Sequence, residues 1–298
     1  MNPLNTKARP VIEVSDSQIK LFHRCPRLWA YKKLLKIDPP EDKDNLIFGT
    51  GVHSGLEHLH KGGDVAGALD KCREKCAKEA PKNEVLRNQA AALVEGYSRH
   101  LFPIFSRNWH TTGSEVWYEY FPAPEVKVRG SRDLEACAVI NHSHEGVFDF
   151  KTTAYNDGGD LGKTIPTNVQ LSLYAISRCR QTGRWPSEQG LIFLQKPRQK
   201  NPQDWIQRAV TDHTLYSMKS EPFTPAMALY CMAVEEGIVA AAKQMHAIAR
   251  MFDLHGPAAL DLAMPILDHC FDYGRMCGFY GGCHAFKPVH KVMSGRTV

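Results

Sequence analysis

The sequence predicts an α/β fold in which a mixed central sheet is flanked by helices, with a helical N-terminal part and a cysteine-bearing C-terminal tail. Helical patterns fill the first third of the 298-residue chain, and β-branched and aromatic runs gather between residues 114 and 153. A helix, two more strand candidates and a long closing helix follow. This order is typical of an α/β or α+β core with helical additions. With 43% hydrophobic residues, the chain can bury a substantial core in one large domain or two smaller ones.

The N-terminal third reads as a series of helices. The stretch "SDSQIKLF" is a capped helix start, with Ser15 or Ser17 as the capping residue and an interruption near Pro26. After the polar loop "DPPEDKDN", the stretch "FGTGVHSGLEHLHKGG" predicts a second helix that ends in a glycine pair. Further helices fit residues 64–80 and 84–106.

The middle of the chain changes to strand patterns. Three runs predict a meander: "SEVWYEYF", "EVKVRGSRDLEACAVI" and "GVFDFKTT", separated by turn-like "PAP" and "NHSHEG". A helix over about 166–183 follows, with proline near its start and glycine at its end. Two more strands are predicted at "QGLIFLQK" and "DWIQRAVTD", then a long helix from Pro225 to about Leu254.

Composition narrows the class of protein. No apolar run approaches the ~20 residues that a membrane helix needs, and the N-terminus lacks the apolar core of a signal peptide. We therefore expect a cytoplasmic protein with no membrane partner. In a reducing compartment, the nine cysteines serve as core residues, metal ligands or redox groups rather than disulfides. A formal net charge of +5 permits a nucleic-acid partner without requiring one.

The segment "KLFHRCPRLWAYKKLLK", residues 20–36, is the most basic stretch of the chain. It holds six lysines and arginines and no acid, interleaved with Phe22, Trp29 and Tyr31. Cations beside aromatic rings suit single-stranded nucleic acid. The alternative is an amphipathic helix whose aromatic residues are core, and for the aromatic residues we prefer that interpretation.

The strand "EGVFDFKTT" carries an unusual pair of charges. Its alternation places Val147, Asp149 and Lys151 on one face and the two phenylalanines on the other. Taken alone, the pair fits a weak surface ion pair. Asp133, in "GSRDLEA", lies on the preceding strand, so its carboxylate can approach that of Asp149. Two or three converging carboxylates form the minimum site for Mg²⁺ or Mn²⁺, and Mn²⁺ also accepts a histidine as a further ligand. Such ions promote phosphodiester hydrolysis.

Two helices carry further candidates. Gln170 and Tyr174 lie one turn apart on a single helix face, directly after the strand with Asp149. His53 and Glu57 have the same spacing on an earlier helix, beside "GTG". Each of these residues alone is more often an ordinary surface or structural residue, and only their joint occurrence favours a metal site.

The ordered series "SDSQIKLFHRCPRLWAYK", "FGTGVHSGLEH", "GSRDL", "FDFKTT" and "QLSLY" resembles the RecB-type branch of the PD-(D/E)XK nuclease superfamily. The resemblance implies a single domain over residues 1–298 with a restriction-endonuclease-like core. It also implies a role for each candidate residue: His53, Asp133 and Asp149 as metal ligands, Lys151 as catalytic lysine, and Gln170 with Tyr174 as the helix motif that holds the DNA strand and the site.

Three acids near the motif complicate the assignment. The first motif acid follows Arg132 where the family has proline, and Glu135 shares a face with Asp133, which leaves open which acid binds metal. Glu119 resembles an accessory acid found upstream in such nucleases, and Glu115 competes for that role. We expect both of these glutamates to lie on the surface.

Four cysteines fit a second site. Cys25, in "HRCPRLW", lies where RecB-type nucleases with an iron-sulfur staple carry their upstream cysteine, and Cys270, Cys277 and Cys283 lie in the tail. The resemblance to AddB-type, CRISPR-associated and phage nucleases implies a [4Fe-4S] cluster that ties the helix at 15–37 to the tail at 265–290. The tail departs from the spacing of the best-known members, since Gly274 stands where one cysteine is expected, so zinc is the rival metal. The other five cysteines are expected in the core.

Taken together, these features predict a metal-dependent DNA nuclease, with exonuclease action in recombination, repair or end processing as the expectation from the resemblance. The substrate is DNA as single strands or duplex ends, and a helicase or recombination protein is a candidate partner. The alternatives are a DNA-binding or scaffold module that kept the fold but lost catalysis, and a nuclease acting on RNA.

Overall fold

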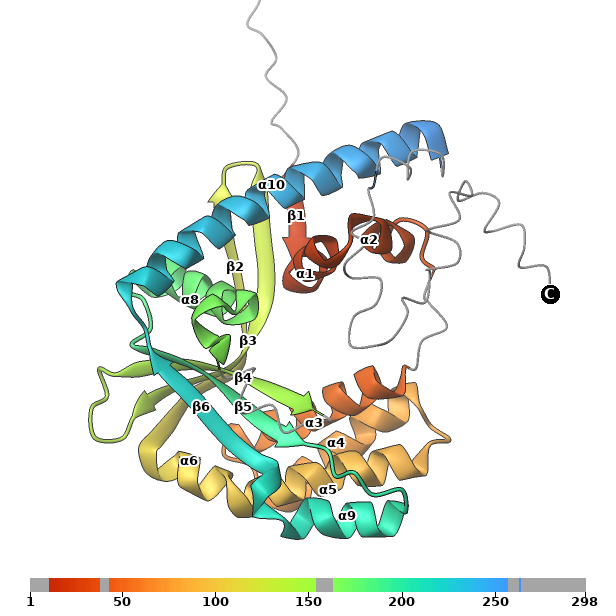
Figure 1. Ribbon diagram of the computed structural model, residues 1–298, viewed down its shortest axis with the longest axis vertical. Helices are drawn as coiled ribbons and strands as arrows, with labels where there is room; N and C mark the ends of the chain where they lie inside the picture. The colour runs from red at the N-terminus through yellow and green to blue at the C-terminus, as the bar shows by residue number, and fades with distance from the viewer. Residues whose placement is uncertain (1–10, 38–42, 154–162, 257–262, 264–298) are drawn as a thin grey trace, which may run out of the picture. The chain divides into compact units, whose positions relative to one another are not determined.

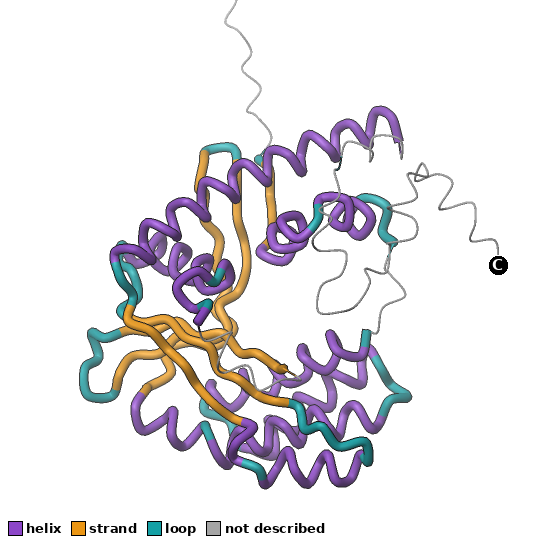
Figure 2. Tube along the Cα trace, viewed as in Figure 1, coloured by secondary structure: helices purple, strands orange, loops and turns teal. Residues whose placement is uncertain are grey.

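The computed structural model describes residues 11–37, 43–153, 163–256 and 263. Its helices and strands follow one another along the chain as β1 (Ile12–Ser15), α1 (Asp16–Arg24), α2 (Pro26–Lys33), α3 (Asp44–His60), α4 (Val65–Glu79), α5 (Glu84–His100), α6 (Phe102–Asn108), β2 (Trp109–Ala123), β3 (Val126–Ala138), β4 (Glu145–Thr153), η1 (Ile165–Thr167), α8 (Val169–Thr182), β5 (Glu188–Gln195), α9 (Pro202–Thr211), η2 (His213–Leu215), β6 (Tyr216–Pro222) and α10 (Pro225–His255). The predicted class, a mixed sheet flanked by helices, is confirmed (Figure 2).

Six strands form one mixed sheet in the order β1-β3-β4-β5-β6, with β2 paired to β3. β3 runs antiparallel to β4, β4 parallel to β5, and β5 antiparallel to β6. The parallel step from β4 to β5 passes through α8, as a crossover between parallel strands requires. Because the chain returns through this helix, α8 lies against the strand that carries Asp149.

The chain divides into two compact units. The smaller holds the described parts of 1–41, 119–130 and 234–298, and the larger holds those of 42–118 and 131–233. The predicted single domain stays a prediction. In the smaller unit, β1 pairs in parallel with the first half of β3, from Ile12 opposite Val126 to Ser15 opposite Arg129.

The start of the smaller unit follows the predicted capping. Ser15 accepts a 3.3 Å hydrogen bond from the Gln18 amide and caps α1. The chain is extended at Cys25, and Pro26 then occupies the first turn of α2, where its missing N–H costs nothing. Phe22, Trp29 and Tyr31 are all buried, with Phe22 edge-on to Trp29 at 5.5 Å. The core interpretation of these aromatic residues is therefore confirmed.

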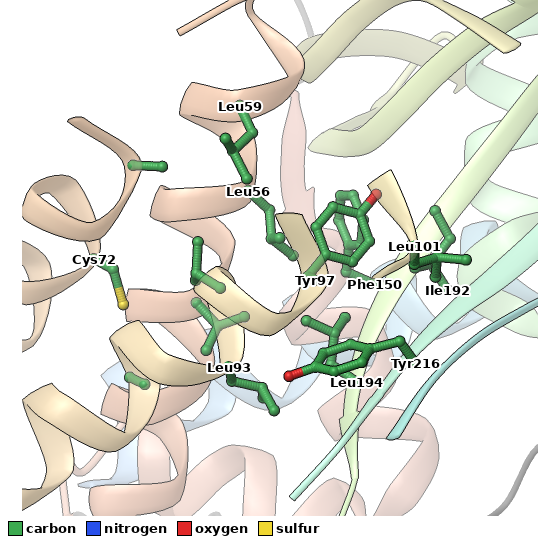
Figure 3. Packing of buried hydrophobic residues seen from close by; sticks show 14 of the residues in the cluster. Leu56, Leu59, Cys72, Leu93, Tyr97, Leu101, Phe150, Ile192, Leu194 and Tyr216 are labelled. Carbon is green, nitrogen blue, oxygen red and sulfur yellow. The ribbon is translucent and has the colours of Figure 1, made fainter. Parts of the chain in front are cut away.

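The larger unit places helices on both faces of its strands. α3, α4, α5 and α9 lie on one side of β4, β5 and β6, and α8 lies on the other (Figure 1). Figure 3 shows the core between the first set of helices and the sheet, where Leu56, Tyr97 and Phe150 meet. Phe148 and Phe150 both join this core, so the alternation predicted for β4 is confirmed.

His60 is a polar residue inside that core. It is 6% exposed and contacts Phe102, Phe105 and Phe150 through its ring. Its two ring nitrogens lie 2.9 Å from the Thr111 hydroxyl and 2.8 Å from the Tyr97 hydroxyl. Burial lowers the pKa of His60 to about 3, so the imidazole is neutral in the folded protein.

One predicted strand is wrong. The stretch "DWIQRAVTD" lies in α9, where Trp205 and Ala209 are buried one turn apart and Ile206 and Val210 pack beside them. The apolar period is therefore helical, and Asn201 caps the helix by accepting a hydrogen bond from the Gln203 amide at 2.8 Å. The second strand after α8 is β6, a polar strand that the sequence patterns missed.

α10 is the one helix in the described part of the chain that is long and apolar enough to cross a membrane, judged by length and composition alone. Its most apolar 18-residue window has a mean hydropathy of 1.3, and 28% of that window is buried. The sequence interpretation, which found no run of this kind, missed this property of the helix. The absence of a membrane partner stays a prediction.

Candidate metal site

The candidate site lies wholly within the larger unit and is built from α3, β2, β3, β4 and α8. His53 lies in the middle of α3, where its ring packs edge-on to Phe150 at 5.9 Å. Its Nδ1 is 3.5 Å from Asp133 Oδ2 and 3.5 Å from Glu115 Oε1. One ligand atom from each of these three residues lies within 4.8 Å of the others, an arrangement that can hold a metal ion.

Glu115 is the site residue that the sequence analysis placed wrongly. It was expected on the surface, but it is only partly exposed, and Ser131 donates a 2.9 Å hydrogen bond to its Oε2. Its backbone has φ 50°, a left-handed conformation that costs a residue with a side chain roughly 1–2 kcal/mol. A left-handed residue within β2 turns the strand locally, and no spacing in the sequence reveals that turn. Glu119, by contrast, is exposed and pairs with Lys127 at 2.6 Å.

Asp133 is held by three neighbours. Its Oδ1 accepts a 2.7 Å hydrogen bond from the Tyr174 hydroxyl, and its Oδ2 accepts one of 3.0 Å from the Phe150 amide and faces His53. The side chain is 9% exposed. A buried carboxylate held by fixed donors keeps one orientation, which is what a metal ligand needs.

Asp149 lies beside this group rather than inside it. Its Oδ2 forms an ion pair with Lys151 Nζ at 2.5 Å, and the Tyr174 hydroxyl is 3.4 Å from its Oδ1. Burial raises the pKa of Asp149, Lys151 opposes that rise, and the charge of Asp133 adds to it. For Lys151, burial lowers the pKa, but the carboxylates of Asp149 and Asp133 outweigh burial and raise it. The lysine is therefore a cation beside a buried acid.

The donor set fits a hard divalent cation. His53 supplies one imidazole nitrogen, and Glu115 and Asp133 supply carboxylate oxygens. Mg²⁺ prefers the oxygens, and Mn²⁺ also accepts the nitrogen. Asp149 Oδ2 is buried and, in the described part of the chain, has the ion pair but no well-aligned hydrogen bond. An oxygen with unused lone pairs is therefore available beside the three-residue group.

The metal-free histidine carries a proton. Burial lowers the pKa of His53, but the hydrogen bond to Glu115 and the charges of Asp133, Asp149 and Glu115 outweigh it and raise the pKa to about 9. At neutral pH the imidazolium is thus the counter-ion of the acids. A cation that binds through this nitrogen must displace the proton.

Glu135 does not compete for the metal. It forms ion pairs with Arg132 and, at 3.2 Å, with Arg178, away from His53. Arg132 is 1% exposed and donates to Ser177 Oγ at 2.8 Å and to Gln181 Oε1 at 2.6 Å, both on α8. This guanidinium, at the position where the family has proline, therefore links β3 to α8 by hydrogen bonds next to Asp133.

The remaining predicted residues differ in where the structure places them. Gln170 is partly buried in the first turn of α8, one turn before Tyr174. Glu57 forms an ion pair with Lys61 at 2.5 Å. Cys25 is buried, and the Leu28 amide donates to its sulfur at 3.5 Å, whereas Cys270, Cys277 and Cys283 lie outside the described residues. Of the five cysteines expected in the core, four are buried and Cys179 is partly exposed.

Comparison of the sequence with models of known protein families identifies the family of this chain. The family model of the PD-(D/E)XK nuclease superfamily matches residues 13–255. The chain belongs to the PD-(D/E)XK nuclease superfamily. Membership suggests a metal-dependent nuclease, and the aspartates and lysine of the motif lie on the neighbouring strands β3 and β4. A comparison with curated proteins gives no match.

Proposed function

We propose that this chain is a Mg²⁺- or Mn²⁺-dependent nuclease that hydrolyses phosphodiester bonds in DNA, acting as an exonuclease in recombination, repair or end processing. One observation carries the proposal: His53, Glu115 and Asp133 converge within 4.8 Å beside the Asp149–Lys151 ion pair. Superfamily membership supports it. Exonuclease action and a helicase or recombination partner rest on the RecB-type resemblance, and a cytoplasmic location rests on composition.

The role that we propose for each residue follows from its charge. A divalent ion held by His53, Glu115 and Asp133, with Asp149 beside them, would polarise the phosphate and lower the pKa of bound water. Lys151 is protonated, so it can stabilise negative charge on the phosphate or orient the attacking water. Tyr174 keeps its proton because burial and the neighbouring carboxylates raise its pKa well above the usual value. It therefore acts as a fixed donor to the carboxylates.

We also propose the iron-sulfur staple, with Cys25, Cys270, Cys277 and Cys283 as ligands. Supporting it, Cys25 is buried at the start of α2, where a backbone amide donates to its sulfur. Such donors stabilise a ligating thiolate. Anaerobically purified protein should contain ~4 iron and ~4 sulfide per chain, and Cys25→Ser should lose both. Stoichiometric zinc without sulfide would refute the cluster.

The nuclease proposal is tested with end-labelled single-stranded DNA, duplex DNA and RNA in Mg²⁺ or Mn²⁺. Wild-type protein should release mononucleotides or short products from DNA ends, and Asp149→Asn and Lys151→Ala should each lose at least ~100-fold in rate. Glu119→Gln is the matched control, because that acid is exposed and pairs with Lys127.

Each other result has a defined meaning. Cleavage that persists in both Asp149→Asn and Lys151→Ala would refute the site. Binding of DNA without cleavage in either metal would favour the scaffold module, and cleavage restricted to RNA would change the substrate. Products from the interior of a circular strand would replace the exonuclease with an endonuclease.

A further inference from the structure

We propose that Lys75 on α4 forms a phosphate subsite that binds a non-scissile phosphate of the substrate strand. The inference rests on the proposed nuclease function and adds a binding residue outside the motif. Lysine binds phosphate as a point charge, without base preference, so the subsite would add affinity for nucleic acid of any sequence.

A cleft of about 580 Å³ in the larger unit joins Lys75 to the candidate metal site. Its lining includes Lys75, Glu57 and the three residues of the metal group, His53, Glu115 and Asp133. The three residues of the metal group thus share one open space with a lysine from a different helix. The cleft therefore offers a strand bound at the metal group a path toward Lys75.

The charges that line the cleft leave Lys75 available. Glu57 is already paired with Lys61, and His53 is already shared between Glu115 and Asp133. Among the residues that the structure describes, Lys75 forms no ion pair or hydrogen bond. An exposed lysine usually stays solvated, but this one faces a cleft whose other charged groups are mostly acids. A phosphate beside the acids requires a compensating cation, and Lys75 is suited to supply it.

The packing of α4 on α3 fixes where Lys75 lies. A Cβ added at Gly51 would clash with Cys76 Sγ, so glycine allows the two helices to approach closely. Cys76 Sγ also donates to the Ile47 carbonyl at 3.7 Å. Lys75 precedes Cys76 in the chain, and the tight contact therefore holds its backbone beside the part of α3 that lines the cleft.

The test compares Lys75→Ala with Lys71→Ala. Lys71 lies one turn earlier on the same helix, pairs with Glu74 at 3.2 Å and does not line the cleft. Lys75→Ala should raise KM for DNA roughly five- to tenfold with kcat within about twofold. In EDTA, the slope of log affinity against log salt, measured by fluorescence anisotropy, should fall by about one phosphate contact. Lys75→Arg should behave like wild type.

Equal behaviour of the two alanine variants would overturn the inference. A fall in kcat with unchanged KM would also overturn it, because Lys75 would then act on the reacting group. The binding arm separates this inference from the proposed function. If wild-type protein binds DNA without cleaving it and Lys75→Ala still lowers the salt slope, the subsite stands and the nuclease proposal falls. A wild-type protein that binds neither DNA nor RNA would overturn both.

Discussion

Tyr174 joins α8 to the candidate metal site by donating a 2.7 Å hydrogen bond to Asp133 Oδ1. The same hydroxyl is 3.4 Å from Asp149 Oδ1, so one phenol contacts an acid on each of two neighbouring strands. Both contacts are buried, which makes a hydrogen bond to a charged group stronger than it would be in water. The orientation of the carboxylates thus depends on a side chain that does not itself bind metal.

Tyr174→Phe should keep the fold and lower cleavage roughly ten- to a hundredfold, since a hydrogen bond to a charged group is worth about 1.5–3 kcal/mol. The concentration of Mn²⁺ needed for half-maximal rate should rise, because Asp133 loses a donor that orients it. Tyr230→Phe, which removes a hydrogen bond to the Thr167 carbonyl, is the control and should leave both quantities unchanged. A Tyr174→Phe variant with wild-type metal dependence would contradict this role.

Arg132→Met should destabilise the protein by about 3–5 kcal/mol in urea unfolding, because it leaves Glu135 buried with less compensating charge. Adding Glu135→Gln should recover at least ~1 kcal/mol, since the remaining group is then neutral. If the double variant is no more stable than Arg132→Met, the ion pair is not the cause of the loss. An additive result would point to the contacts with Ser177 and Gln181 instead.

Glu115→Gly should be more stable than Glu115→Ala by ~1 kcal/mol, because glycine adopts the left-handed backbone at φ 50° without strain. At the neighbouring Val116, glycine should instead be less stable than alanine. Both changes at Glu115 should abolish metal-dependent cleavage, since each removes the carboxylate. Thermal unfolding and the cleavage assay measure the two effects separately, and equal stability of the glycine and alanine variants would show that the backbone is relaxed.

Metal binding should release protons at neutral pH. The pKa of His53 is raised to about 9 in the metal-free protein, so the affinity for Mn²⁺ should increase as pH rises toward 9 and level off above it. Calorimetry in buffers of different ionisation enthalpy should detect about one proton per ion at pH 7. His53→Gln should remove this dependence. Release that persists in the variant would assign the proton to another group.

His60 should make the fold sensitive to acid. Its pKa is about 3 when folded and 6.5 when unfolded, so below pH 6.5 the unfolded chain binds a proton that the folded protein does not. The contribution of His60 to stability should therefore fall by ~1 kcal/mol between pH 7 and 5.5, and continue to fall until pH approaches 3. His53, whose pKa is raised to about 9, opposes this fall, because below pH 9 the folded protein binds a proton that the unfolded chain holds less tightly. The comparison with His60→Gln isolates the His60 contribution: the unfolding free energy of wild-type protein minus that of the variant should decrease by ~1 kcal/mol over this interval.

Sequence patterns predicted the parts of the fold that depend on local periodicity. The alternation of Phe148 and Phe150 with Asp149 gave the correct faces of β4, and serine capping gave the start of α1. The sequence patterns did not reveal β1, because it is four residues long and pairs with a strand more than a hundred residues away. They did not reveal β6 either, because its exposed side chains are polar. The helical period of α9 was mistaken for the pattern of a strand.

The site was predictable only as far as its motifs reach. The spacing of Asp133, Asp149 and Tyr174 anticipated that they would meet, because adjacent strands and the following helix bring them together. Glu115 was named only as a candidate accessory acid and was expected on the surface, since its approach to His53 depends on a left-handed backbone rather than on spacing. The separation of Asp133 from Glu135 likewise depends on Arg132, whose buried contacts have no sequence signature.

The alternation along β4 limits how this protein can change over evolutionary time. Its phenylalanines face the helical core, while Asp149, which contacts Tyr174 on α8, and Lys151 lie on the other face of the strand. Inserting or deleting one residue would therefore exchange the two sets. The charged side chains would then point into the core and the aromatic rings would point away from it. The protein would lose both its fold and its catalytic activity. A lineage that abandons catalysis but keeps this fold must therefore do so by substitution within β4, leaving the length of the strand intact.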